Sequence, residues 1–289
     1  MSNLVPDVLE RLDPTANAAP VVFDSPHSGN IYPEDFGHCI GRIHLRRTED
    51  AFVDELFADA PGKGATLVRA LFPRSYIDPN RLPDDIDPSI LRGSWPYRAN
   101  PGEKARLGVG LIPTREPGGG VYDRVLSVEE AVNRLDSYYW PYHRELEEAL
   151  DRVQLQGGSF WHVNCHSMPA VSTSVSPEGP GVPRPDFCLG TRDGTTCDME
   201  FTELVEGFLA SLGYSVTIDD PYKGVELVRR YSDPLHRRHS LQIEVNRGLY
   251  MDEARITRHD GFAALKADIG RLVAAVCDYA RARIGAGQL

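Results

Sequence analysis

The segment "SFWHVNCH" at residues 159–166 is typical of a buried β-strand with polar groups on one face. Side chains alternate between the two faces of a strand, so Val163 and Cys165 are expected to point into apolar packing. The opposite face carries His162, Asn164 and His166. His166 ends this strand, and open α/β sheets bind their ligands in the crevice beyond the carboxyl ends of their strands. The segment therefore predicts a polar site at one edge of a sheet.

Other segments of the same apolar character alternate with amphipathic helical segments along the chain. The further strands are expected at residues 20–25, 66–71, 186–191, 214–219 and 241–248. Such alternation predicts an α/β sandwich. Neither an internal repeat nor a linker interrupts the pattern, so residues 1–289 are expected to form a single domain.

Several helices have recognisable ends in the sequence. Thr48 is expected to cap a helix over residues 49–60, which would place Glu49 and Asp50 in its first turn. Ser127 and Glu130 form the S-x-x-E pattern of a capping box. The helix that they begin should kink or split at Pro141, because proline cannot donate to the helical hydrogen-bond ladder. Further helices are expected at about residues 198–212 and 260–284.

The composition predicts a globular cytoplasmic protein. Apolar runs are shorter than the roughly 20 residues that a membrane span needs, and the first residues do not resemble a secretion signal. The formal net charge of −11 disfavours binding to nucleic acid. The five cysteines are scattered and lack a C-x-x-C pair, so we expect buried free thiols rather than disulfides or a thiolate zinc site.

Two long connections are rich in proline and glycine. They run from Pro73 to about Tyr122 and over residues 171–186. Connections of this length in compact domains are commonly lids or binding loops, and surface insertions without a function are the alternative.

A second strand-end histidine suggests a metal site. His27 follows the apolar segment "VVFDSP" as His166 follows its own strand, so the two imidazoles are expected at the same edge of the sheet. A hydrolytic zinc site needs three protein ligands and one position for water. Asp50 is the preferred third ligand, Glu49 is the alternative, and Asp54 is a candidate outer partner. The alternative for each histidine is a hydrogen-bonded structural role.

Charged residues near other strand ends complete the candidate site. Glu244 lies among apolar strand residues, where an unpaired carboxylate is costly, so it is either a general acid/base or half of a structural ion pair. Asn80 and Arg81 open the first long loop, and arginine can bind a carboxylate with two parallel hydrogen bonds. The segment at 222–231 adds Arg229. In an acidic protein these cations indicate either a small anionic ligand or solvated surface charge.

The chain resembles the N-formylglutamate amidohydrolase family, a group of histidine-degradation enzymes related to zinc carboxypeptidases and aspartoacylase-type deacylases. The motifs that carry the resemblance are "SPHSG" (25–29), "EDAFVDELF" (49–57), "SYIDPNR" (75–81), "YYWPYH" (138–143), "NCHSM" (164–168), "YKGVELVRRY" (222–231) and "HSLQIEVNRGLYMDE" (239–253). Their order and number make the resemblance specific, although each motif alone is weak.

The resemblance implies a three-layer α/β/α fold with a mixed central sheet and one catalytic Zn²⁺. It implies that His27, Asp50 and His166 bind the metal, with Glu244 as the general acid/base. It further implies that Asn80 and Arg81 bind the α-carboxylate of the substrate. Arg229 and His239 would contact the side-chain carboxylate or the oxyanion.

The expected reaction is hydrolysis of N-formyl-L-glutamate, a small anionic amino-acid derivative, to formate and L-glutamate. The sequence departs from the family pattern at Ala51-Phe52, at Val228 and at Arg247, and these changes could reshape the acyl or side-chain pocket. A deacylase for another N-acyl amino acid is therefore the first alternative. The second is a non-catalytic protein that binds an acidic metabolite. The oligomeric state is left open.

Overall fold

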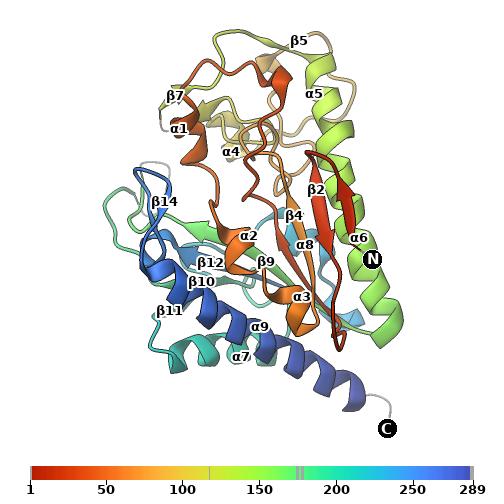
Figure 1. Cartoon of the computed structure of the whole chain (residues 1–289). Coiled ribbons are helices and arrows are strands. Elements are labelled where there is room, and N and C mark those ends of the chain that lie inside the picture. The colour runs from red at the N-terminus through yellow and green to blue at the C-terminus, as the bar shows by residue number, and fades with distance from the viewer. Residues whose placement is uncertain (1, 117, 174–175, 177–178, 287–289) are drawn as a thin grey trace.

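The computed structural model describes residues 2–286 except 117, 174–175 and 177–178, and its central feature is a mixed β-sheet (Figure 1). Within these residues the sheet has eight strands in the order β1-β2-β4-β3-β9-β12-β10-β11. The strands are β1 (Asn3–Val5), β2 (Leu9–Leu12), β3 (Val21–Ser25), β4 (Thr66–Ala70), β9 (Phe160–Met168), β10 (Phe187–Gly190), β11 (Val216–Ile218) and β12 (Arg238–Asn246). All six strands expected from the sequence are confirmed, whereas the N-terminal hairpin β1-β2 was not predicted.

The centre of the sheet is parallel. β4, β3, β9 and β12 are consecutive parallel neighbours, and β2 and β10 flank them antiparallel. In this register Asp24 lies beside Asn164, and Glu244 lies beside His166. The carboxyl ends of three central strands therefore meet at one edge, as the positions of the two strand-end histidines predicted.

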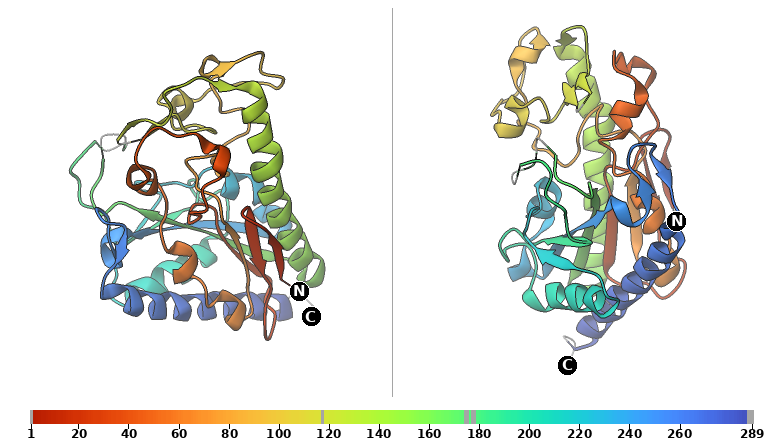
Figure 2. Two further views of the ribbon diagram at one scale, coloured as in Figure 1. Left: turned by 45° about the horizontal axis from the view of Figure 1, so that its top comes forward. Right: turned by 90° about the vertical axis from the view of Figure 1, so that its left-hand side faces the viewer.

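Helices cover both faces of the sheet, so the predicted three-layer α/β/α fold is confirmed (Figures 1 and 2). One face packs against α2 (Val53–Leu56), α3 (Ala60–Lys63), α7 (Met199–Ser211) and α9 (Gly261–Ala286). The other face packs against α6 (Trp140–Gly157) and α8 (Glu226–Tyr231). Val163 and Cys165 belong to the core beneath α9, and this leaves the polar side chains of β9 on the face of α6.

The single helix predicted over residues 49–60 is wrong. Residues 49–52 form a turn, and α2 and α3 are separate short helices after it. Phe52 precedes α2 with a left-handed φ of 68°, which ends any helix that started earlier. The hydroxyl of Thr48 donates to the carbonyl of Leu45 instead of capping a helix. Asp50 is thus held by a turn.

The other helix predictions are confirmed. Ser127 and Glu130 form both hydrogen bonds of a capping box at the start of α5 (Val128–Arg134). The interruption expected near Pro141 is a π-helical segment, η3 (Leu135–Tyr139), after which the proline lies in the first turn of α6. Asp198 caps α7 through the backbone N–H of Phe201.

The loop from Pro73 to Tyr122 contains short elements and supplies residues to the strand ends. It includes η2 (Pro88–Ile90), β5 (Leu91–Arg92), α4 (Glu103–Arg106), β6 (Arg115–Glu116) and β7 (Gly119–Gly120). The remaining short elements are η1 (Glu34–Phe36), α1 (Arg42–Arg46), β8 (Leu126–Ser127), η4 (Pro234–His236), η5 (Arg247–Leu249), β13 (Met251–Asp252) and β14 (Thr257–Arg258). Part of the second long loop, over 171–186, lies outside the described residues.

The cysteine prediction is confirmed in part. Cys165, Cys188, Cys197 and Cys277 are buried free thiols, but Cys39 is exposed. No helix in the described part of the chain is both long enough and apolar enough to span a membrane.

Gly29 allows the chain after β3 to pass directly against the backbone of Leu71 and Phe72. A Cβ at this position would lie 2.2 Å from the carbonyl oxygen of Phe72 and 2.4 Å from the carbonyl carbon of Leu71. Backbone atoms cannot rotate away from such a contact. The glycine therefore fixes the path of the turn that carries His27.

We expect Gly29→Ala to lower the free energy of unfolding by about 1–3 kcal/mol, the usual cost of overpacking. Denaturant unfolding would measure the change. The matched control is Gly207→Ala in α7, where the added methyl group meets nothing within 4 Å. Because alanine is the better helix former, that control should be neutral or more stable. Equal stability of the two variants would contradict the close approach at Gly29.

Candidate metal centre

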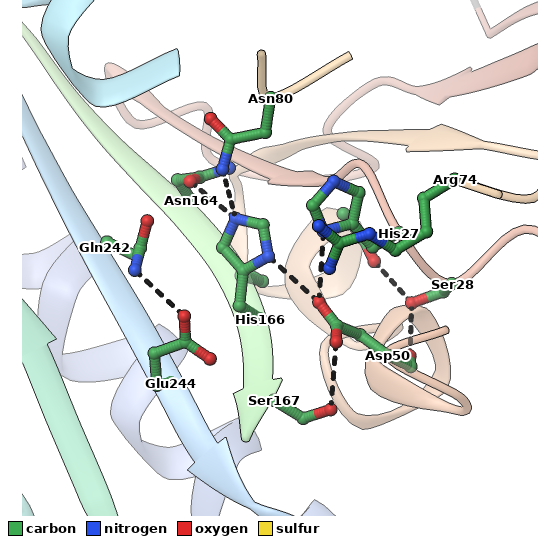
Figure 3. Close-up of polar contacts among 12 residues, drawn as sticks. His27, Ser28, Asp50, Arg74, Asn80, Asn164, His166, Ser167, Gln242 and Glu244 are labelled. Atoms are coloured by element: carbon green, nitrogen blue, oxygen red, sulfur yellow. Dashed lines mark hydrogen bonds and ion pairs between the residues drawn. The ribbon is translucent and has the colours of Figure 1, made fainter. Parts of the chain in front are cut away.

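His27, Asp50 and His166 converge at the carboxyl edge of the sheet (Figure 3). His27 follows β3, His166 lies near the end of β9, and Asp50 comes from the turn before α2. One potential ligand atom from each residue lies within 4.8 Å of the other two, and all three side chains are buried. The sequence-based prediction that these three residues lie close together is therefore confirmed.

The inward-facing atoms fit a divalent cation. Asp50 Oδ2 lies 2.9 Å from His166 Nδ1 and 3.4 Å from His27 Nδ1. His27 Nδ1 is buried without a hydrogen-bond partner among the described residues. Burial raises the pKa of Asp50, but its contacts with His166 and His27 outweigh this and hold the pKa well below the usual value. Two imidazole nitrogens and one ionised carboxylate are therefore available to one ion.

The outer nitrogen of His27 is held by a second carboxylate. His27 Nε2 lies 2.7 Å from Asp78 Oδ1, and Asp78 Oδ2 accepts a hydrogen bond from Arg74 at 2.6 Å. Burial of Asp78 is outweighed by the charges of Arg74 and His27, so the pKa of its carboxyl lies well below the usual value. An ionised Asp78 accepts a hydrogen from Nε2, which leaves Nδ1 with its lone pair facing Asp50.

A buried network contacts the outer nitrogen of His166. Asp24 Oδ1 accepts from Asn164 Nδ2 at 2.8 Å, and burial of Asp24 is outweighed by its hydrogen bonds, so its pKa is lowered. The amide oxygen of Asn164 is thereby turned toward His166 Nε2, 2.7 Å away. A hydrogen on Nε2 satisfies this oxygen and leaves Nδ1 free to bind a cation, whereas the Asn80 amide nitrogen, 3.2 Å from Nε2, is a donor that would pair with the other tautomer.

The same Asp24 carboxylate anchors residues below the centre. His162 Nε2 lies 2.8 Å from Asp24 Oδ1, and His162 Nδ1 lies 2.6 Å from Ser240 Oγ. Tyr142 donates to Asp24 Oδ2 at 2.7 Å. His162 thus has the structural role that the sequence left as an alternative for such histidines.

The geometry favours Asp50 over Glu49 as the third ligand. Glu49 accepts hydrogen bonds from Tyr32 and Arg46 and is not part of the cluster. Asp54 forms an ion pair with Arg69, so its carboxylate does not act as the outer partner expected from the sequence.

Glu244 faces this centre, and no arginine in the described part of the chain forms an ion pair with it. It lies beside His166 in the parallel register, and its Oε1 accepts a hydrogen bond from Gln242 at 2.9 Å (Figure 3). Burial raises the pKa of this carboxyl to about 7, although the charge of His166 opposes the shift. A carboxyl group with a pKa near neutrality can both accept and return a proton.

Asn80 and Arg81 also reach the centre. Asn80 Oδ1 accepts from the backbone N–H of Leu227, and its Nδ2 lies 3.2 Å from His166 Nε2. The side chain of Arg81 is 14% exposed and lies 3.9 Å from Asp78. Its buried Nε has no hydrogen-bond partner among the described residues. An anion beside the metal centre could supply that partner.

The other two candidate substrate contacts are placed differently. Arg229 is half-exposed on α8 and forms an ion pair with Glu226. It comes two residues after Leu227, whose backbone N–H donates to Asn80. His239 lies near the start of β12, where it stacks on Trp161 and faces Asp198. Glu244 is five residues further along the strand and on its other face. His239 therefore does not reach the metal centre, because it lies on the other face of β12 from Glu244 and five residues before it.

Sequence reasoning missed two contributors to the site and one contact of a third. Arg74 and Asp78 lie in or beside the "SYIDPNR" motif but were not assigned roles. A buried aspartate in a motif with neighbouring arginines was the available signal. Arg247, which was expected only as a residue that could reshape the substrate pocket, also donates a hydrogen bond to Asp50.

Known proteins resemble this chain over most of its length. A family model described as N-formylglutamate amidohydrolase matches residues 19–251. The chain is 32% identical over 208 residues to an N-formylglutamate deformylase of Pseudomonas putida, covering 71% of each chain. It is 27% identical over 270 residues to an N-formylglutamate deformylase of Pseudomonas aeruginosa, covering 91% of this chain and 95% of the relative.

Solved structures show the same likeness. The crystal structure of an N-formylglutamate amidohydrolase from Ralstonia eutropha JMP134 is 45% identical, with a TM-score of 0.90 over 95% of this chain and 99% of that chain. A gene product of Agrobacterium tumefaciens is 18% identical, with a TM-score of 0.65 over 94% and 96% of the two chains, and shares the fold. Given the match over residues 19–251, the chain belongs to the N-formylglutamate amidohydrolase family.

Proposed function

We propose that this protein is a zinc-dependent hydrolase that cleaves N-formyl-L-glutamate to formate and L-glutamate, as in histidine degradation. The observation that carries the proposal is the buried convergence of His27, Asp50 and His166 beside Glu244. The names of the relatives support the substrate.

The donor set supports zinc as the metal. Two imidazoles and one carboxylate are a ligand set of catalytic zinc sites, which keep a further position for water. When bound, zinc would polarise the formyl oxygen and lower the pKa of the water to about 7. Asp78 and Asn164 hold the outer nitrogens of the two histidines, as partners of metal-bound histidines commonly do.

Glu244 is the proposed general base and acid. It would take a proton from the attacking water and return it to the amine that leaves as the tetrahedral intermediate collapses. The raised pKa of this carboxyl, about 7, suits both transfers. Arg74 donates to Asp78, which contacts His27, and its guanidinium therefore lies beside the centre. We assign to Arg74 the stabilisation of negative charge on the substrate oxygen.

The cations around the centre support an anionic substrate. The buried Nε of Arg81 makes no hydrogen bond within the described residues, and Asn80 presents its amide group next to His166. We assign these two residues to the α-carboxylate. Arg229 remains a candidate for the second carboxylate, but only if the substrate displaces Glu226 from it.

The choice of substrate can be tested with N-formyl, N-acetyl and N-succinyl amino acids. We expect amine release to be fastest from N-formyl-L-glutamate. Faster release from another acyl group would favour a different deacylase, and no release from any compound by metal-loaded protein would favour a binding protein.

Removal of the metal ligands should remove both the metal and the activity. We expect the purified protein to contain about one zinc ion, which His27→Ala and His166→Ala would each lose, because both imidazoles face the cation. Metal analysis and initial rates measure this. His236→Ala is the matched control, since that histidine is 78% exposed and pairs with Asp233. Full activity after thorough chelation would exclude the metal-dependent mechanism.

Glu244→Gln should leave zinc bound and lower kcat by at least about 100-fold, because an amide cannot accept the proton. Glu148→Gln on the exposed side of α6 is the control and should retain activity. A kcat within a few-fold of the unmodified protein would remove Glu244 from the role of base.

Arg81→Gln should raise KM about 10–100-fold, because a charge-assisted hydrogen bond contributes about 1.5–3 kcal/mol. Arg81→Lys should recover part of the loss, since the charge remains without the planar fork. Arg144→Gln, at an exposed position of α6, serves as the control. An unchanged KM for Arg81→Gln would show that the carboxylate binds elsewhere.

A further inference from the structure

Asp50 is the candidate ligand with the least support from regular structure. It lies in the turn that replaces the expected helix, and His166 lies on a central strand. The backbone of Asp50 is tied to the His27 segment, because its N–H donates to the carbonyl of His27 at 3.0 Å and its carbonyl accepts from Ser28 Oγ at 2.9 Å. These bonds fix the main chain but leave the direction of the carboxylate open.

Arg247 fixes that direction from the end of β12. Its Nη2 donates to Asp50 Oδ1 at 2.9 Å, its Nη1 to the carbonyl of Arg47 at 3.0 Å, and its Nε to Ser167 Oγ at 3.0 Å. Ser167 Oγ also lies 3.4 Å from Asp50 Oδ1. The guanidinium thus joins the turn of Asp50 to the ends of β9 and β12.

In the buried pair of Arg247 and Asp50, the two carboxylate oxygens of Asp50 have different contacts. Oδ1 of Asp50 is taken by Arg247, and Oδ2 is left facing His27 and His166. Arg247 is 6% exposed and Asp50 is 1% exposed, so solvent does not compete for this contact. Tyr250 adds a second tie, because its hydroxyl donates to the carbonyl of Ala51 at 3.1 Å.

We propose that Arg247 is a positioning residue for the metal site, which holds Asp50 so that one oxygen alone faces the cation. The proposal rests on the proposed metal-dependent function. Positioning and charge have opposite effects here. Removing a nearby positive charge would by itself strengthen cation binding, whereas loss of positioning weakens it.

The test is zinc affinity, measured by competition with a chromophoric chelator on the full chain. Changes in residues that orient metal ligands typically weaken binding about 10–100-fold. We expect Arg247→Gln to weaken zinc binding by that factor and to alter the visible absorption of the Co²⁺-loaded protein. Arg247→Lys should bind zinc with intermediate affinity, because a single ammonium keeps the charge but cannot reach all the acceptors that the planar guanidinium contacts.

Arg271→Gln is the matched control, since it breaks an ion pair with Asp268 at the surface and should leave both readouts unchanged. Unchanged or tighter zinc binding by Arg247→Gln would overturn the proposal. If that variant does not fold, Ser167→Ala and Arg247→Lys decide, and normal affinity in both would also overturn it. Failure of the unmodified protein to bind zinc would instead contradict the proposed function itself.

Discussion

The parallel pairing of β3, β9 and β12 is the constraint on which the rest of the structure depends. It places the carboxyl ends of three strands at one edge, and it sets Glu244 beside His166 and Asp24 beside Asn164. Side chains alternate along a strand, so a slip of one residue would move each of these groups to the opposite face, into the apolar core. The apolar residues beneath α9, including Val163 and Ile243, therefore fix the positions of the polar groups above them.

A buried polar site also needs partners for nearly every atom, because an unpaired charge in low dielectric is costly. Asp24 and Asp78 meet this requirement for the histidines, and Arg247 meets it for Asp50. Each carboxylate also orients a neighbour. The contacts that stabilise the site therefore also set its geometry. Among the described residues, the buried atoms of the site without a hydrogen-bond partner include His27 Nδ1, Arg81 Nε and Gln242 Oε1, and the first two adjoin the proposed binding positions for metal and substrate.

The sequence predicted what depends on periodicity and missed what depends on local backbone. The alternation in residues 159–166 was sufficient to predict the strand, its faces and the position of His166. The helix over residues 49–60 was wrong because Phe52 adopts a left-handed conformation that its residue type does not indicate. Asp50 nevertheless lies with the two histidines, although spacing alone could not separate it from Glu49. His239 was misplaced because its expected role came from the resemblance alone, whereas strand alternation puts it and Glu244 on opposite faces of β12.

The buried polar cluster below the metal centre would mislead a comparison of active sites that relies on residue contacts alone. Ser240, His162 and Asp24 are joined in the order of a serine hydrolase triad, at 2.6 Å and 2.8 Å. Such triads are recognised by geometry together with roles. All three side chains here are fully enclosed, so an electrophile has no route to the hydroxyl. Contacts between residues alone would suggest a covalent catalyst. The class is excluded because the side chains are enclosed and because the serine lies at Nδ1 and the aspartate at Nε2 of His162, the reverse of a catalytic triad.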